Sequence, residues 1–344
     1  MRIGPEKRDY RRLGICRFPH VDKPTYQDLA LFLLPIHFRN HQDPWSRMSA
    51  AMREYLNLRA SETLGQEELV AFLENRFPKA TRPIGRQVIE GTKCVETRVR
   101  TDSQEFREIA SFVDSRRARG QKHFEYFPIA SYLRKYTKDE LRNAEALTLN
   151  ISSYFEPSGE ECGTIYETLC KKCNLGRQVS DLILDLRFVP QRKDMGQTIA
   201  KVEWIVSSRF VQAFREQGLT GAEFRSVFEF KHPTRKSKDW HQLWITGKAG
   251  KLSEETTLGK DAFSPSQIDW RCPLGHSVAT DILSEIFLQR ETLDGSDIAI
   301  SNDLFGQGRN LLRPTPLIVI SPRLYQLLCE YKIKGFSCEI ARVV

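Results

Sequence analysis

The sequence lacks any apolar run long enough to cross a membrane. Its longest run, residues 29–36, has eight residues, whereas a membrane-spanning helix needs about 20. Residues 1–12 are charged and lead into no apolar segment, so we expect no signal peptide. Together these absences predict a soluble, cytoplasmic protein.

The sequence also lacks the short motifs that mark common active sites. It contains no P-loop, no G-x-S-x-G nucleophile elbow and no G-x-G-x-x-G turn. Catalytic groups that meet only in space leave no such trace in a sequence. Because no catalytic motif is present, we expect a protein without enzymatic activity.

The composition is that of an ordinary globular protein, with an uneven distribution of charge. The 344 residues are 40% hydrophobic and 28% charged, with a net charge of +8, which suits one large or two ordinary domains. Residues 1–150 hold 27 Lys and Arg against 20 Asp and Glu, whereas residues 151–344 hold 25 against 24. The basic excess therefore belongs to the N-terminal half, where it can attract nucleic acid, an anionic surface or an acidic protein.

The N-terminal half has the apolar spacing of helices, with some strand. We predict helices over residues 47–59, 66–76 and 103–113 and a short helix over residues 138–146. Residues 87–100 are rich in Val, Ile and Thr and predict one or two strands.

A dense basic cluster follows the third predicted helix. Its members are Arg116, Arg117, Arg119 and Lys122. The cluster is either a solvated basic face or a site that contacts nucleic acid or another partner.

The C-terminal half contains an internal repeat. Residues 206–221 align without gaps on residues 320–335, with identical Ser, Arg, Gln, Glu and Gly positions. In each copy a strand ends at a Ser that can cap the following helix, and a Gly precedes a second strand. We therefore predict duplicated strand–helix–strand units over residues 204–230 and 317–344.

Four cysteines and one histidine form a candidate metal site. Cys170-Lys-Lys-Cys173 has the C-x2-C spacing that brings two thiolates onto one tetrahedral zinc ion, and the two lysines favour the thiolate form. We expect Cys162 and Cys272 to be the other ligands, with His276 as the substitute for Cys272. The alternative is that all of these cysteines are ordinary reduced thiols.

The cysteine segments resemble a known family. Residues 161–166, Cys170-Lys-Lys-Cys173, residues 204–227 and Arg271-Cys-Pro-Leu-Gly-His276 are similar to the double-CxxCG family of bacterial paralogues, which is abundant in myxobacteria and related to immunity proteins of polymorphic toxin systems. The resemblance covers about residues 145–344. Gly159 stands where the first CxxC has its leading Cys, and Asn174 replaces the glycine after the second. The resemblance implies a zinc-stapled α/β protein that binds and neutralises a cognate toxin without catalysis.

These observations predict an α+β or α/β protein in two regions. Residues 1–145 form a basic, mainly helical region with some strand, and residues 146–344 form a zinc-stapled region with the repeat. The favoured function is an immunity protein that binds a cognate bacterial toxin directly. The alternative is a nucleic-acid-associated bacterial defence protein that uses its basic N-terminal half.

Overall fold

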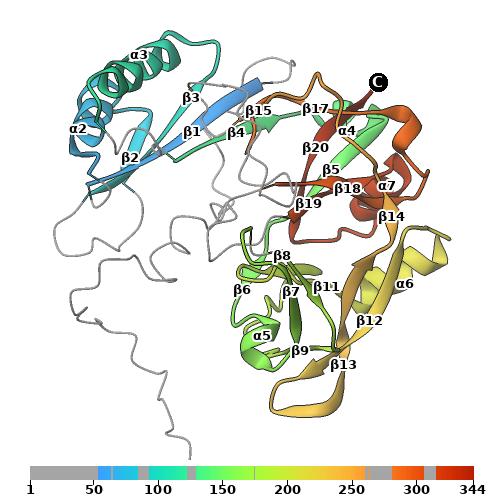
Figure 1. Ribbon diagram of the computed structural model, residues 1–344. Helices are drawn as coiled ribbons and strands as arrows, with labels where there is room; N and C mark the ends of the chain where they lie inside the picture. The colour runs from blue at the N-terminus through green and yellow to red at the C-terminus, as the bar shows by residue number, and fades with distance from the viewer. Residues whose placement is uncertain are drawn as a thin grey trace, which may run out of the picture. The chain divides into compact units, whose positions relative to one another are not determined.

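The computed structural model describes residues 53–62, 65–83, 93–121, 129–173, 175–259, 263, 281–305 and 315–344. All of them belong to one compact unit, Asn40–Val344. They form both helices and strands, so the mixed α and β fold class is confirmed (Figure 1). In the described part, no helix is long and apolar enough to span a membrane.

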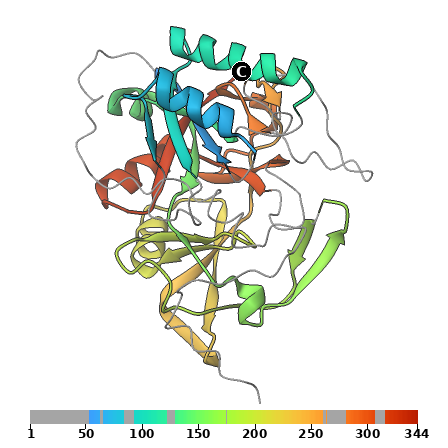
Figure 2. The same ribbon diagram turned by 90° about the vertical axis from the view of Figure 1, so that its left-hand side faces the viewer.

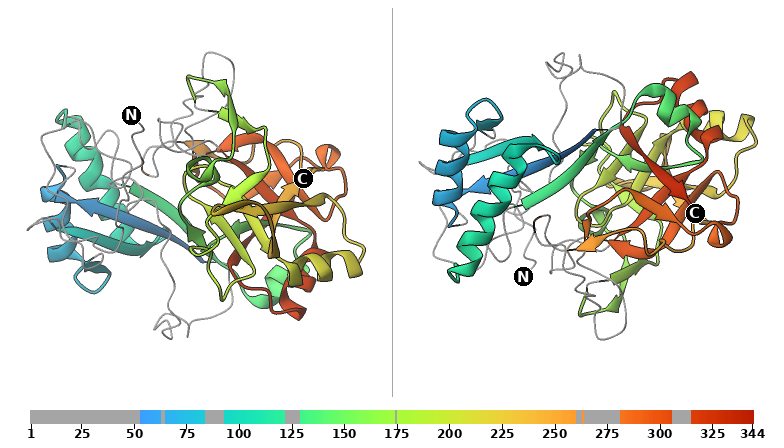
Figure 3. Two further views of the ribbon diagram at one scale, coloured as in Figure 1. Left: turned by 90° about the horizontal axis from the view of Figure 1, so that it is seen from below. Right: turned by 90° about the horizontal axis from the view of Figure 1, so that it is seen from above.

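The N-terminal part is built on a four-stranded antiparallel sheet that carries two helices on one side (Figure 3). Its elements are β1 (Arg53–Ser61), α2 (Glu67–Arg76), β2 (Thr81–Pro83), β3 (Cys94–Arg100), α3 (Gln104–Ala118) and β4 (Ile129–Lys135). The strands lie in the order β2-β3-β1-β4. This β-α-β-β-α-β succession, with β3 between β1 and β2, is the split βαβ arrangement of ferredoxin-like folds.

The described residues of the N-terminal region are organised by a four-stranded sheet together with helices, and a helix-rich region is not supported. Within the predicted helix over residues 47–59, the described residues form strand β1 from Arg53 onward. Leu56, Leu58 and Ala60 lie at every second position of β1 and face the helices. This two-residue spacing of buried side chains is that of a strand rather than of a helix. The predicted helices over residues 66–76 and 103–113 are confirmed as α2 and α3, and the strand over residues 87–100 is confirmed from Cys94 onward.

The C-terminal part contains two six-stranded sheets. The first has the strand order β6-β10-β11-β13-β12-β9 and the second the order β14-β18-β19-β5-β20-β17. The strands of the first sheet are β6 (Tyr154–Phe155), β9 (Leu182–Leu184), β10 (Met195–Thr198), β11 (Trp204–Ser207), β12 (Ala222–Glu229) and β13 (His232–Ile245). Those of the second are β5 (Ala146–Ile151), β14 (Gly247–Lys248), β17 (Ile286–Leu288), β18 (Ile298–Phe305), β19 (Thr315–Ile320) and β20 (Phe336–Val343).

The two sheets have the same topology, position by position. In each, the four inner strands are antiparallel to one another, and both edge strands run parallel to the strand beside them. Between β11 and β12 the chain forms α6 (Ser208–Glu216), and between β19 and β20 it forms α7 (Pro322–Glu330). Both predicted repeats are therefore strand–helix–strand units.

Matched serines start the two helices. The hydroxyl of Ser207 accepts a hydrogen bond from the N–H of Phe210 at 3.3 Å, and that of Ser321 accepts one from Leu324 at 3.2 Å. Both helices bury an apolar face in one core that also includes inner strands of both sheets. The two repeats therefore share their largest core.

The repeats also exchange a strand. The position that β13 occupies in the first sheet is occupied in the second by β5, which precedes the first repeat in the sequence. β13, in turn, precedes the remaining strands of the second repeat. Each repeat thus contributes its leading strand to the other's sheet, so neither sheet is complete without both repeats.

Short elements join these sheets. α4 (Lys138–Asn143) leads from β4 to β5, and α5 (Gly159–Cys162) follows β6. Each repeat then has a separate two-stranded sheet, β7 (Tyr166–Cys170) with β8 (Leu175–Gln178), and β15 (Leu258–Gly259) with β16 (Asp281–Ile282). A 3-10 turn, η3 (Arg290–Thr292), precedes β18. The predicted division at residues 145 and 146 falls between α4 and β5, and two separate domains remain a prediction.

Candidate functional site

The β7–β8 hairpin brings two of the predicted zinc ligands together. Cys170 ends β7, and Cys173 lies in the turn before β8. Both side chains are buried and pack with Leu175 as a small cluster of their own. The turn thus presents the donor pair that a C-x2-C zinc knuckle supplies, which is two of the four ligands of a tetrahedral site.

The third predicted ligand lies in a different setting. Cys162 is the last residue of α5 and is buried. Burial raises the pKa of its thiol to about 11. Among the described residues, no three His, Cys, Asp or Glu side chains form a group that could hold a metal ion. Cys272 and His276 lie outside the described residues, so the four-ligand zinc site remains a prediction.

The segment with Cys170 and Cys173 and the segment with Cys272 and His276 occupy equivalent places in the two repeats. The C-x2-C pair belongs to the hairpin that the first repeat forms between its strands β6 and β9. Cys272 and His276 lie in the sequence between β15 and β16, the corresponding hairpin of the second repeat. The candidate ligands therefore fall in equivalent segments of the duplicated unit.

The predicted basic cluster lies at the end of α3. Arg116 forms an ion pair with Glu68 of α2, and its guanidinium lies 4.5 Å from the ring centroid of Phe112. Arg117 pairs with Asp114 at 3.7 Å. Arg119 is the exposed C-terminal cap residue, and Lys122 lies outside the described residues. Two of the four cations are thus engaged by neighbouring acids, and their role in binding a partner remains a prediction.

Exposed apolar side chains on the β7–β8 hairpin were not predicted from the sequence. Ile165, Leu169 and Val179 are 61%, 47% and 52% exposed. Ile165 and Val179 are cross-strand neighbours, because the N–H of Val179 donates to the carbonyl of Ile165 at 3.0 Å. Leu169 lies further along β7. We call these three residues the apolar hairpin surface. The hairpin projects beside the first sheet in Figure 2 and pairs with no other described strand, and Gln178 at its base accepts a hydrogen bond from Gln242 of β13 at 2.7 Å.

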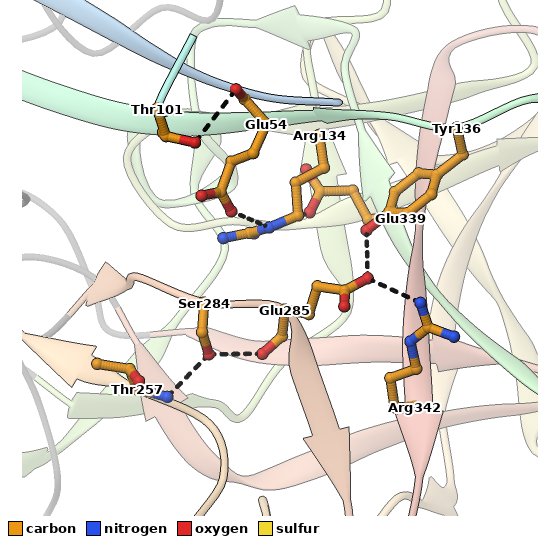
Figure 4. A network of polar contacts seen from close by, with 9 residues as sticks. All are labelled: Glu54, Thr101, Arg134, Tyr136, Thr257, Ser284, Glu285, Glu339 and Arg342. Carbon is orange, nitrogen blue, oxygen red and sulfur yellow. Dashed lines mark hydrogen bonds and ion pairs between the residues drawn. The ribbon is translucent and has the colours of Figure 1, made fainter. Parts of the chain in front are cut away.

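A buried charge network was also missed. Arg134 of β4 is 3% exposed, and its Nε donates to Glu54 of β1 at 2.7 Å (Figure 4). Its Nη1 donates to Glu339 of β20 at 3.4 Å, so it joins the ferredoxin-like part to the second sheet. Burial raises the pKa of Glu339 despite the nearby Arg134. A sequence gives no signal for this network, because its members are up to 205 positions apart.

A second carboxylate joins the same region. Glu285 accepts hydrogen bonds from Tyr136 at 3.5 Å and from Arg342 at 3.3 Å (Figure 4). Burial, followed by the charges of Glu339 and Glu285, raises the pKa of Tyr136, so its hydroxyl stays protonated. These contacts describe a structural junction between β4, β20 and the chain before β17.

No protein-family model matches the sequence. No curated protein matches it either.

Proposed function

We propose that this protein binds another protein through the β7–β8 hairpin and that the partner is a cognate bacterial toxin, which it neutralises by contact alone. The observation that carries the proposal is the apolar hairpin surface. Exposed apolar side chains gathered on one element are typical of protein–protein contact sites. An ion pair lies among them, since Glu167 and Arg177 pair across the hairpin at 2.6 Å between the Ile165–Val179 pair and Leu169.

A structural zinc ion belongs to this proposal. Cys170 and Cys173 would supply two thiolate ligands, with Cys162 and Cys272 as the others and His276 as the substitute for Cys272. Zinc would supply stability to the turn that carries the apolar side chains, because the binding energy of a structural site is folding energy. In the cytoplasm, where thiols stay reduced, a metal would take the place of a disulfide.

The resemblance to the double-CxxCG family supports the nature of the partner. The proposal can be tested by coexpression with the products of the neighbouring genes, taking as the candidate toxin one that arrests growth when expressed alone. The wild-type protein should restore growth, whereas Ile165→Asp with Leu169→Asp should not, because charged groups would face an apolar surface on the toxin.

A control variant shows whether protection is lost because the hairpin no longer contacts the toxin or merely because an exposed apolar residue has become charged. Val344 is 46% exposed and lies far along the chain from the hairpin. Val344→Asp should protect as the wild type does. Full protection by the doubly substituted hairpin would contradict the proposed contact surface, and absence of protection by the wild type would contradict the proposed function.

A further inference from the structure

The far end of the β12–β13 hairpin carries exposed aromatic rings among cations. Phe230, between the two strands, is 43% exposed, and Phe188, after β9, is 54% exposed. The hairpin extends past β9 at the lower edge of Figure 1. We call the two rings and the four cations around them the distal hairpin surface. Its members are Arg187, Phe188, Phe230, Lys231, Arg235 and Lys236.

The backbone around these rings is ordered by pairing on both sides. β12 pairs with β13 as far as Glu229 opposite His232, and β9 runs parallel to β12 up to the same Glu229. The N–H of Phe230 donates to the carbonyl of Leu184 in β9 at 3.0 Å. The ring of Phe230 is therefore held at the surface by the sheet itself.

Two cations lie over aromatic rings of this region, one over the exposed Phe188 and one over the half-buried Phe228 of β12. The guanidinium of Arg187 lies 5.6 Å from the ring centroid of Phe188, and the ammonium of Lys236 lies 5.9 Å from that of Phe228. These distances are within the range of cation–π contacts.

The surface has more positive than negative charge. Arg235 pairs with Glu229 at 3.2 Å, and Arg187 pairs with Asp185. Lys231 and Lys236 are exposed and form no ion pair with any described residue. Two cations thus stay uncompensated by direct contacts beside two exposed rings.

We propose that the distal hairpin surface binds single-stranded nucleic acid. Exposed aromatic rings stack on unpaired bases, and neighbouring Lys and Arg side chains contact the phosphates. The exposed apolar groups here are aromatic, unlike the aliphatic side chains of the apolar hairpin surface. Arg187 lies near the ring of Phe188, and Lys231 follows Phe230 in the chain. A duplex, whose bases are already stacked, offers these rings no such partner. An acidic protein could pair its carboxylates with the cations, but it has no bases to stack on the aromatic rings.

The distal hairpin surface shares no residue with the basic cluster at the end of α3 or with the apolar hairpin surface. Arg116 and Arg117 pair with Glu68 and Asp114, and Arg116 lies over the half-buried ring of Phe112. The inference therefore goes beyond the proposed function, and its test uses different residues.

The test is fluorescence anisotropy of the full chain with labelled 12-nucleotide single strands of DNA and of RNA. Affinity should fall linearly on a log–log plot as salt rises, with a slope of about −0.7 for each phosphate contacted. Lys231→Ala with Arg235→Ala and Lys236→Ala should weaken binding about tenfold or more and flatten this slope.

A control with the same loss of charge is available. Lys79, Lys138 and Lys251 are exposed and form no ion pair with the described residues. Replacing all three with Ala should change the affinity less than about threefold, because their charges act only at long range. Equal weakening by the two triple variants would overturn the proposal.

Stacking is tested at Phe230. Phe230→Ala should weaken binding about 5- to 150-fold, which corresponds to the loss of one base–aromatic stack, whereas Phe230→Trp should preserve it. Thermal unfolding of each variant checks that the hairpin still folds. Equal affinity of wild type and Phe230→Ala, tighter binding to duplex, or equal binding to poly-glutamate would each overturn the assignment, the last in favour of an acidic protein partner.

Discussion

Arg209 and Arg323 occupy equivalent positions in the two repeats, and each reaches the end of the other repeat's helix. Arg209 donates from Nη1 to the carbonyl of Tyr331, the residue that follows α7, at 2.8 Å. Arg323 donates from Nη2 to the carbonyl of Gln217, which follows α6, at 3.1 Å. A cation at a helix C-terminus is favourable because it meets unpaired carbonyls and the negative end of the dipole.

Each arginine is oriented by an aspartate of its own repeat. Asp194 accepts from Arg209 at 2.6 Å and Asp297 accepts from Arg323 at 3.3 Å. Each aspartate also accepts a backbone N–H from the other repeat, since Lys334 donates to Asp194 at 2.9 Å and Thr220 to Asp297 at 3.0 Å. The two repeats are thus joined by reciprocal copies of one clamp.

The first prediction concerns these clamps. Asp194→Ala and Asp297→Ala should each lower the free energy of unfolding by about 1–3 kcal/mol, the cost of leaving buried donors without an acceptor. Chemical denaturation measures the change. Because the clamps are equivalent, a large effect at one and none at the other would contradict their shared role.

The same clamp predicts a pH dependence. Burial alone would raise the pKa of Asp194, but hydrogen bonds from Arg209, the Lys334 backbone and Ser207 outweigh it and lower the pKa. Its ionised form therefore stabilises the fold above the ordinary pKa of an Asp, about 3.9, and this stabilisation is lost as the pH falls through the lowered value. Asp194→Ala should lose less stability than the wild type on acidification. Parallel pH profiles would contradict this.

Part of the architecture could be predicted because its signals are local. The apolar spacing that produces α2 and α3 lies within single segments, and Ser207 and Ser321 mark both helix starts in the repeat. β1 was misassigned because Met48, Met52 and Leu56 have a near-helical spacing, whereas Leu56, Leu58 and Ala60 alternate. The alternation prevails because it places Leu56, Leu58 and Ala60 on the one face of β1 that packs against α2 and α3.

The exchanged strands could not be predicted, because nothing in β5 or β13 encodes which sheet it joins. The aspartates of the clamps precede β10 and β18, but the loops that separate those strands from the aligned segments differ in length. A gapless alignment of the repeats therefore ends before it reaches Asp194 and Asp297. Of the candidate zinc ligands, only Cys170 and Cys173 are close in sequence, and the fold brings that pair together.

A second prediction follows from the strand exchange. Phe214 and Leu328 are equivalent buried residues of α6 and α7 in the shared core. Phe214→Ala and Leu328→Ala should each cost about 2–5 kcal/mol. Because each sheet contains a strand of the other repeat, thermal unfolding should stay a single transition of the C-terminal part in both variants. Separate transitions for the two repeats would show that the exchange does not couple them.

The third prediction concerns Arg134. Arg134→Met should lower stability by about 3–5 kcal/mol, because breaking a buried ion pair leaves its partners uncompensated. Glu339→Gln should be milder, since an amide keeps an acceptor for Arg134 without the charge. Denaturation of both variants at neutral pH provides the comparison, and a smaller effect of Arg134→Met than of Glu339→Gln would contradict it.

Glu339 also gives a pH dependence of opposite sign to that of Asp194. Burial first, and then the charges of Glu54 and Glu285, raise its pKa even though Arg134 lowers it. The folded state therefore holds this proton more tightly than the unfolded chain. Stability contributed by the protonated carboxyl is lost as the pH rises from the ordinary pKa of Glu, about 4.3, through the raised value. Glu339→Gln should lack this loss, and equal slopes in the two proteins would contradict it.

The last prediction concerns zinc. If Cys170 and Cys173 supply two ligands of a structural site, elemental analysis of chelator-free protein should find about one zinc ion per chain. Cys173→Ser removes a ligand and should lower both the zinc content and the melting temperature, because metal affinity contributes directly to folding. Cys329→Ser is the matched control, since Cys329 is exposed on α7 and belongs to no predicted ligand set. A chelator should destabilise the wild type and leave Cys173→Ser unchanged. Protein purified without metal and insensitive to the chelator would refute the zinc site, and the two buried thiols would then be ordinary core cysteines of the hairpin.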